Sequence, residues 1–335
     1  MRQFLQMMKR RRSSWSEALI VAPGCDTVTI CQIGGTRLHT LNIRATDLQR
    51  GSESVAQLVS HFRHLHPRAG RTILLLPRNQ YAFKRFELPP CESKHLPEVM
   101  RNQLELRSSF GADRAYFDYV SISEHLQSAS KQQLYGMYIA PRPLIDGWRV
   151  ALDEAGLSLD QVTTQTQIAA ETFGAKAASS GVLSVVSNNS GIELIYAWEG
   201  AVCATGFIES LPGENPNIVQ LSAETDRLRA SLSAPMVVEE IHVAGDRDEA
   251  IAAVLIKMFP GLPVSASQSR ATVGSNGGNV MLSLATGPSA IDLLRHAHTV
   301  SPAVAVRRRR ILVAGAAALL CFSGLLGADA KLRHL

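Results

Sequence analysis

Apolar and polar residues alternate in two parts of the chain, and a period of two predicts strands of a half-buried sheet. The first part begins at Ala18 with ALIVAPGCDTVTICQIGGTRLHTLNI, in which IGGTR supplies a hairpin turn. The second is GVLSVVSNNSGIELIYAWEGAVCATGFI at residues 181–208, a three-strand meander with turns at residues 187–191 and 199–200. A predicted helix follows each part, so strand, strand, strand, helix occurs twice.

Apolar residues at helical spacing predict those two helices. The first covers residues 52–66, with Ser52 as a cap and one apolar face made of Val55, Leu58, Val59, Phe62 and Leu65. The second covers residues 217–233, and a strand at 239–245 and a helix at 248–259 follow it. We therefore expect a duplicated α/β domain.

An inserted β-α-β-β-α block separates the two copies. Its predicted elements are strands at residues 72–77 and 81–89, a helix at 92–110 with Pro97 in its first turn, strands at 114–122 and 133–141, and a helix at 142–157 closed by Gly156.

The end of the chain has a different pattern. Residues 311–328 carry no charge over 18 residues, and as a helix they span about 27 Å, close to the roughly 30 Å hydrocarbon core of a membrane. A buried core helix is the alternative, but it would have no place for the four preceding cations, Arg307, Arg308, Arg309 and Arg310. Such cations favour the cytoplasmic membrane surface, so we expect one C-terminal transmembrane helix, with residues 1–310 in the cytoplasm.

These patterns predict six parts. They are a basic disordered tail at residues 1–16, a first domain at 17–180 that includes the inserted subdomain at about 72–152, a second domain at 181–289, a linker at 290–310, the transmembrane helix at 311–328 and a short periplasmic tail at 329–335. The N-terminal tail lacks an apolar stretch after its charges, so it does not match a secretory signal peptide.

Charge and cysteine content narrow the function classes. The net charge is +5, but eight cations lie in two runs, at residues 9–12 and 307–310, and the rest of the chain is slightly acidic. Because the excess of basic residues is confined to these two runs, the charge pattern does not predict a nucleic-acid partner. The five cysteines are odd in number and contain no C-x-x-C motif, which indicates reduced thiols. No metal site is predicted, because His61, His64 and His66 have no acidic residue to join them.

No familiar catalytic motif occurs, neither G-x-S-x-G nor a Walker A loop nor G-x-G-x-x-G. Two turns could present backbone N–H groups to a phosphate, SNNSG at residues 187–191 and PGCDT at residues 23–27. Phosphate chemistry with Mg²⁺ also needs carboxylates; the turn at residues 23–27 offers only Asp26, and the turn at residues 187–191 offers none. We predict no catalytic residues.

Four stretches together resemble a known family. They are LIVAPGCDTVTI, the inserted block from LLLPRNQYAFKRFELPP to GMYIAPRPLIDGWRVALDEAGLSLDQV, VLSVVSNNSGIELIYAWEGAVCATGFI, and IHVAGDRDEAIAAVLIKMFPGLPV. In order and spacing this set resembles the type IV pilus assembly protein PilM and the cytoplasmic domain of the type II secretion protein GspL, over residues 18–290. The resemblance implies two actin-like (ribonuclease H-like) domains with an inserted subdomain.

The resemblance also implies a nucleotide site, from which this sequence departs. The acid expected in the first hairpin falls at Ala22, the second Asp-x-Gly falls on Val186, Ser187 and Asn188, and the usual Gly-Gly reads Gly245 and Asp246. We therefore expect the ATPase fold with little or no hydrolysis and no required cofactor, while weak binding of ATP and Mg²⁺ is left open. The residues of this degenerate site would be Gly24, Asp26, Thr27, Ser187, Asn188, Ser190, Gly245 and Asp246.

A second resemblance concerns AIDLLR at residues 290–295. It resembles the short cytoplasmic peptide of PilN, typically Ile-Asn-Leu-Leu-Pro, which PilM binds and which precedes a membrane helix. Here the motif is Ile291, Asp292, Leu293 and Leu294, with Arg295 in place of Pro. Docking of this motif on the chain's own domain is one hypothesis, and a helical turn in a linker is the other.

The two resemblances imply a membrane-anchored, catalytically degenerate scaffold of a type IV pilus or type II secretion inner-membrane assembly platform. Such a scaffold would recruit a cytoplasmic motor ATPase and contact PilN/PilO-like or GspM-like inner-membrane proteins and the lipid bilayer, with a homodimer left open. Two alternatives are kept: an active membrane-bound actin-like or sugar-kinase-like ATPase or phosphotransferase, and a filament-forming membrane tether.

Overall fold

The structure is a computed structural model of the 335-residue chain. It describes residues 18–23, 28–32, 38–41, 71–109, 111–122, 132–154, 156–174, 181–188, 191–198, 200–209, 217–232, 238–245, 248–266 and 289–296. The helix predicted at 52–66, the arginine run and the segment at 311–328 all lie outside these residues. Within them, no helix is long and apolar enough to cross a membrane.

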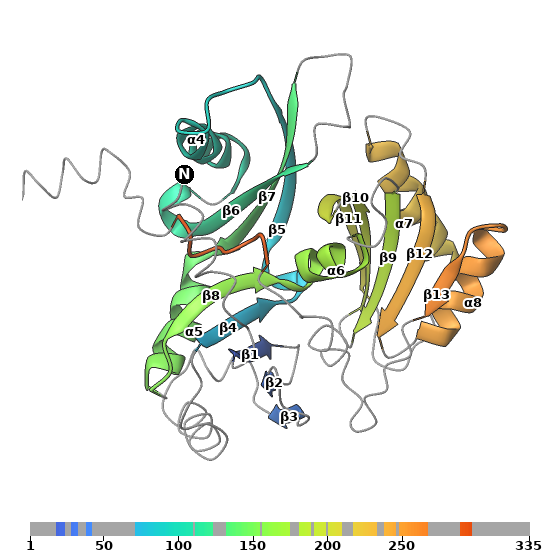
Figure 1. The fold of residues 1–335 in the computed structure, drawn as a ribbon, viewed down its shortest axis with the longest axis horizontal. Helices are drawn as coiled ribbons and strands as arrows, with labels where there is room; N and C mark the ends of the chain where they lie inside the picture. Colours follow the sequence, from blue (N-terminus) through green and yellow to red (C-terminus); the bar gives the residue numbers. More distant parts are fainter. Residues whose placement is uncertain are drawn as a thin grey trace, which may run out of the picture. The chain divides into compact units, whose positions relative to one another are not determined.

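Two five-stranded sheets have the same strand order (Figure 1). The first contains β1 (Ala18–Pro23), β2 (Val28–Gln32), β3 (Leu38–Leu41), β4 (Arg71–Leu76) and β8 (Leu159–Thr164), in the order β3-β2-β1-β4-β8. The second contains β9 (Gly181–Asn188), β10 (Gly191–Trp198), β11 (Ala201–Glu209), β12 (Val238–Gly245) and β13 (Val264–Ala266), in the order β11-β10-β9-β12-β13.

Strand directions match as well as strand order. In each sheet the first three strands form an antiparallel meander, and the last two join in parallel. The duplication predicted from the repeated pattern is therefore confirmed at the level of topology.

The inserted elements form a separate three-stranded sheet. It is built from β5 (Ala82–Leu88), β6 (Ala115–Ile122) and β7 (Gln133–Pro141) in the antiparallel order β5-β7-β6, together with α4 (Leu96–Arg107) and α5 (Arg142–Glu154). Short 3-10 turns lie at Arg78–Gln80 and Ala112–Arg114. The sequence interpretation counted residues 72–77 in this insertion, whereas the structure places β4 in the first sheet, because β4 pairs in parallel with both β1 and β8.

Most predicted helices are present with slightly different ends. α7 (Ile218–Ser231) starts after Asn217, whose side-chain oxygen accepts hydrogen bonds from the backbone of Val219 and Gln220. α8 (Asp248–Met258) matches its prediction, and Pro97 lies in the first turn of α4. Gly156 follows α5 with a φ of 75°, the left-handed conformation that glycine adopts without strain.

Three elements were not predicted: β8, β13 and the helix α6 (Gln165–Gly174). α6 follows β8 directly, and eight of its ten residues are buried. A helix buried on all sides has no polar face, so the apolar stripe that identifies a surface helix is missing.

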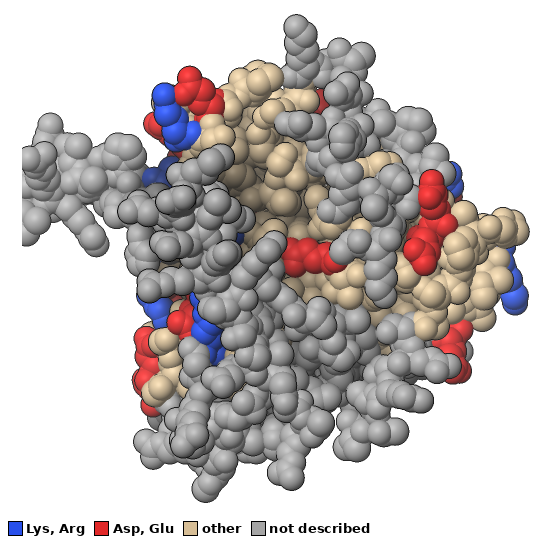
Figure 2. Space-filling view, viewed as in Figure 1, with Lys and Arg blue, Asp and Glu red and all other residues tan. Residues whose placement is uncertain are grey.

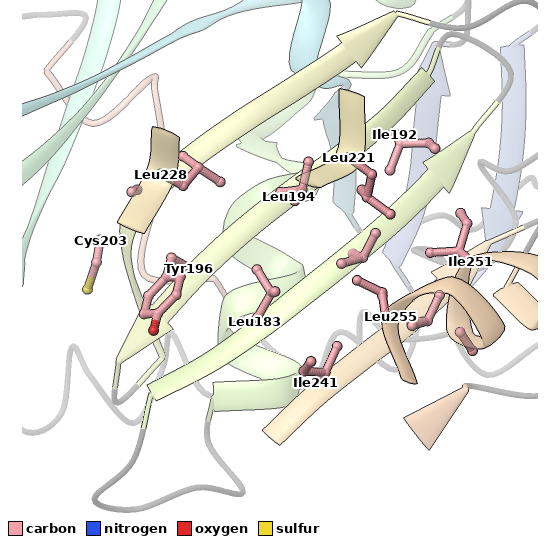
Figure 3. Close-up of a cluster of buried hydrophobic side chains, with 14 of the residues drawn as sticks. Leu183, Ile192, Leu194, Tyr196, Cys203, Leu221, Leu228, Ile241, Ile251 and Leu255 are labelled. Atoms are coloured by element: carbon pink, nitrogen blue, oxygen red, sulfur yellow. The ribbon is translucent and has the colours of Figure 1, made fainter. Parts of the chain in front are cut away.

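The second sheet has a continuous apolar core against α7 and α8 (Figure 3). Side chains that point to one face of the sheet meet side chains from both helices: Leu183, Ile192, Leu194, Tyr196, Ile241, Leu221, Leu228, Ile251 and Leu255. Burial of each large side chain contributes roughly 1.5–3 kcal/mol to folding. On the face drawn in Figure 2, the described acidic and basic side chains lie in small groups of both signs.

Candidate functional site

Residues 289–296, here named the docked segment, lie against the edge of the first sheet. β8 is the last strand of that sheet, and its backbone at Val162 pairs with the segment: Leu293 N donates to Val162 O at 2.9 Å, and Val162 N donates to Asp292 Oδ1 at 3.3 Å. The side-chain amide of Gln161 donates to Ile291 O at 3.2 Å. The segment therefore covers a strand edge that would otherwise be open, as peptides do when they bind beside an edge strand. Figure 1 shows it in orange-red beside β6 and β8.

Two apolar side chains anchor the docked segment. Ile291 and Leu293 are both 0% exposed, whereas Leu294 is only half-buried. A turn that simply hung in a linker would not bury two large side chains completely. Of the four residues of the predicted peptide motif, three thus contact the body through buried side chains or hydrogen bonds: Ile291, Asp292 and Leu293.

A buried carboxylate holds the polar part of the docked segment. Asp118 of β6 is 0% exposed, and its Oδ2 accepts the backbone N–H of Asp292 at 2.7 Å. The guanidinium of Arg295 lies 3.2 Å from the same carboxylate, and Nε2 of His296 lies 3.2 Å from Oδ1. Burial of a carboxylate is costly unless charged or polar groups pair with it, and three of the partners of Asp118 come from the segment.

The imidazole of His296 also packs on two aromatic rings of β6. It stacks on Phe117 with ring centroids 5.5 Å apart and on Tyr119 with centroids 5.3 Å apart. These contacts and the pairing with Asp118 fix the C-terminal end of the docked segment on β6. We name the β8 edge at residues 161–163, residues 117–119 of β6 and Glu171 of α6 the docking surface.

Glu171 completes the docking surface at the other end of the segment. Its Oε1 accepts the backbone N–H of Ala290 at 2.7 Å, the hydroxyl of Ser289 at 3.2 Å and the side-chain amide of Gln167 at 2.8 Å. Burial raises the pKa of Glu171, although these three donors act in the opposite direction. Burial likewise raises the pKa of Asp292, although the backbone N–H groups of Leu294 and Val162, which donate to it, act to lower this pKa. Both shifts mean that the docked state binds protons more strongly than a solvated carboxylate would.

The predicted nucleotide site is described only in part. Gly24, Asp26, Thr27, Ser190 and Asp246 lie outside the described residues, and Asn188 is described only as the end of β9. Ser187 and Gly245 are neighbours on the parallel strands β9 and β12. A Cβ at Gly245 would overlap the carbonyl oxygen of Ser187, and φ there is 126°, so glycine is required at this position. Among the described residues, no group of three or more His, Cys, Asp or Glu could hold a metal ion.

A second buried carboxylate was missed by sequence reasoning. Glu193 of β10 is 1% exposed; its Oε1 accepts the Thr166 hydroxyl at 2.5 Å and the Thr205 hydroxyl at 3.3 Å. Arg78 lies 3.7 Å away, and the Tyr81 hydroxyl is 3.5 Å away. Burial raises the pKa of Glu193 to about 7, although these hydrogen-bond and charged partners act to lower it. The signal in the sequence was one acid inside the apolar strand IELIYAW, and Asp118 in AYFDYVSI carries the same signal.

No family model and no curated sequence matches the chain. Solved structures do match. A chain of the PilM–PilN type IV pilus biogenesis complex aligns with a TM-score of 0.58 and 14% identity, covering 81% of this chain and 95% of that chain. The cytoplasmic domain of EpsL, an inner membrane component of the type II secretion system of Vibrio cholerae, aligns with a TM-score of 0.50 and 10% identity, covering 83% and 96%.

A protein of unknown function from Bacteroides thetaiotaomicron with an actin-like ATPase fold aligns with a TM-score of 0.48 and 11% identity, covering 82% and 97%. Identities this low show a common fold and not a common activity. The chain has the actin-like ATPase fold, as the PilM–PilN complex and the EpsL cytoplasmic domain do.

Proposed function

We propose that the chain is a membrane-anchored scaffold of a type IV pilus or type II secretion inner-membrane assembly, with little or no ATPase activity. Its actin-like body carries, in the same polypeptide, the peptide segment that precedes the apolar segment at residues 311–328. The body recruits a cytoplasmic motor ATPase, and the apolar segment ties it to the bilayer and to PilO-like or GspM-like partners.

One observation carries the proposal. The docked segment contains the AIDLLR motif, which resembles the PilN peptide, and it binds the body through two buried side chains and the carboxylate of Asp118. A matching solved structure is a complex of PilM with PilN. An actin-like body that holds such a segment is what a fused PilM-like and PilN-like chain requires.

The short connection between the docked segment and the arginine run suits a protein that positions its partners at the membrane. Only ten residues separate His296 at the end of the docked segment from Arg307. Even fully extended, ten residues span at most about 36 Å, so docking would set an upper limit on the distance between the body and the membrane surface. Restriction to that layer raises the local concentration of the body near other membrane-bound partners.

The test is fractionation followed by partner capture from the native cell. The full chain should sediment with membranes, and detergent extracts should contain assembly-platform proteins and a motor ATPase bound to it. The matched variant Leu319→Asp with Leu320→Asp keeps the described body intact, and we expect it in the soluble fraction because two charges in the apolar segment oppose insertion. An intact chain that stays in the supernatant would refute the anchor, and a capture without assembly proteins would refute the scaffold.

The proposal also includes a nucleotide site that has little or no ability to hydrolyse ATP. It is supported by the absence of an acid at Ala22 and at Val186, where the resemblance expects one. Turnover of Mg-ATP by the purified chain that is abolished by Asp26→Asn would instead support the alternative, an active phosphotransferase.

A further inference from the structure

The helix α6 connects the docking surface to the second sheet. It contacts β8 of the first sheet and β9, β10 and β11 of the second (Figure 1). The contact is especially close where α6 ends: a Cβ at Gly174 would lie 2.8 Å from the backbone nitrogen of Gly200 in the β10–β11 turn. Gly200 itself has a φ of 78°, which favours glycine. The helix and the turn therefore meet backbone to backbone.

One side-chain amide of α6 is bonded in three directions. Gln167 is 1% exposed, and its Oε1 accepts the hydroxyl of Tyr138 from β7 at 2.6 Å. Its Nε2 donates both to Glu171 Oε1 at 2.8 Å and to the carbonyl oxygen of Gly200 at 3.1 Å. A carboxylate and a carbonyl oxygen can only accept, so the orientation of the amide is determined by its partners.

Glu171 is in turn oriented by the docked segment. The oxygen that accepts from Gln167 is the same one that accepts from Ala290 N and the Ser289 hydroxyl. If the segment leaves, Glu171 loses both donors and gains water, and its side chain is free to adopt other rotamers. Gln167 then loses one of the three partners that orient its amide, which weakens the hold on the other N–H group that donates to Gly200 O.

We propose that Gln167 and Glu171 couple docking of residues 289–296 to the contact between α6 and the β10–β11 turn. Docking tightens this turn, and displacement of the segment loosens it, through Gln167, which lies one helical turn from Glu171 and donates to Gly200 O. Since coupling between two sites is reciprocal, any partner that stabilises the turn also strengthens docking. The coupling depends on the proposed function only for its use in the cell, because every contact in it is internal to the chain.

Hydrogen exchange of the purified full chain in detergent tests this coupling. The segment is displaced by Ile291→Asp with Leu293→Asp, and displacement is verified by faster tryptic cleavage after Arg295. We expect amide exchange in residues 196–204 to rise about tenfold on displacement when Gln167 is present. In a Gln167→Met background, exchange there should already be fast and should rise less than about twofold on displacement.

Gln161→Met is the matched control, because it removes a glutamine side chain that bonds the docked segment directly but leaves the path through Gln167 to Gly200 intact. It should retain the tenfold response. Glu171→Gln keeps an acceptor oxygen and should retain the response too, whereas Glu171→Ala should lose it, which provides a second route if Gln167→Met is poorly folded. The coupling is overturned if the turn exchanges equally with the segment docked and displaced. No partner protein enters the assay, so this failure is distinct from failure of the scaffold proposal.

Discussion

Two carboxylates occupy apolar strands, and their burial is offset in different ways. Asp118 depends on groups from the docked segment, which comes from the far end of the described chain. Glu193 depends on hydroxyl groups of Thr166 and Thr205 and on Arg78, all inside the folded body. Removal of the docked segment would thus leave Asp118 without these partners, whereas none of these partners of Glu193 belongs to the segment.

At Glu193 we expect a stability that depends on pH. Burial raises the pKa of Glu193 from 4.5 to about 7, so between these values the folded chain binds a proton that the unfolded chain has lost. The free energy of unfolding should therefore fall as pH rises from about 5 to about 8, by on the order of 3 kcal/mol from this group. Glu193→Gln should remove that part of the slope in urea unfolding at several pH values.

The control for this measurement is Glu87→Gln. Glu87 is exposed on β5, so Glu87→Gln removes a carboxyl elsewhere and should leave the contribution of Glu193 to the slope in place. A Glu193→Gln variant with an unchanged slope would contradict the assignment of the buried proton to this carboxyl.

Gly245 is expected to tolerate no side chain. Gly245→Ala would place a Cβ against the carbonyl oxygen of Ser187 at a φ of 126°, so the end of β12 must shift. We expect a loss of at least about 2 kcal/mol in the free energy of unfolding. Gly147→Ala in α5 meets no atom within 4 Å and should be neutral or slightly stabilising in the same urea titration. Equal stability of the two variants would contradict the close approach of β9 and β12.

At the scale of elements, the docked segment behaves as part of the first sheet although it contains no regular strand or helix. It adds one backbone hydrogen bond and one carboxylate to the edge of β8, and its two buried side chains supply the apolar contact. The distinction between Leu293 and Leu294 follows from the turn that begins at Leu293, since only one of two adjacent side chains can point into the body.

Truncation of the two leucines should therefore have unequal effects. Leu293→Ala removes a fully buried side chain and should weaken docking by about 3 kcal/mol, which is roughly a hundredfold shift toward the undocked state. Leu294→Ala should cost less than about 1 kcal/mol. The measurement is the rate of tryptic cleavage after Arg295, which reports the undocked population when docking and undocking are fast. Equal rates for the two variants would show that the segment binds in another register.

At the scale of the whole molecule, the same topology occurs twice and the inserted sheet interrupts only the first copy. The resemblance implies a nucleotide site with residues from both copies, and this chain lacks the acids expected at Ala22 and at Val186. Because Mg²⁺ prefers carboxylate ligands, the proposed degenerate site would bind a metal-nucleotide complex weakly.

Mg-ATP is therefore expected to stabilise the chain very little. With a Kd of 1 mM or weaker, 1 mM Mg-ATP adds at most about 0.4 kcal/mol to the free energy of unfolding. Thermal unfolding of the purified full chain with and without Mg-ATP measures this effect, and Mg-GTP is the control for unspecific binding. Stabilisation of several kcal/mol by Mg-ATP alone would contradict the degenerate site.

Local patterns in the sequence determined most of the strands and surface helices, because each depends on neighbouring residues. The meander at residues 181–208, α7 and α8 follow from alternation, turns and helical spacing, and the order of elements was sufficient to indicate the actin-like fold. Even the peptide motif at residues 290–295 was visible as a sequence resemblance.

Only the tertiary structure decided where these parts meet. TTQTQ at residues 163–167 looks polar and loop-like, yet it ends β8 and begins the buried helix α6, because its side chains bond to groups from the second sheet and from β7. Asp118 and the docked segment lie more than 170 residues apart in the chain. Alternation and helical spacing carry information about neighbours along the chain, whereas the pairing of a buried carboxylate depends on which distant groups folding brings to it.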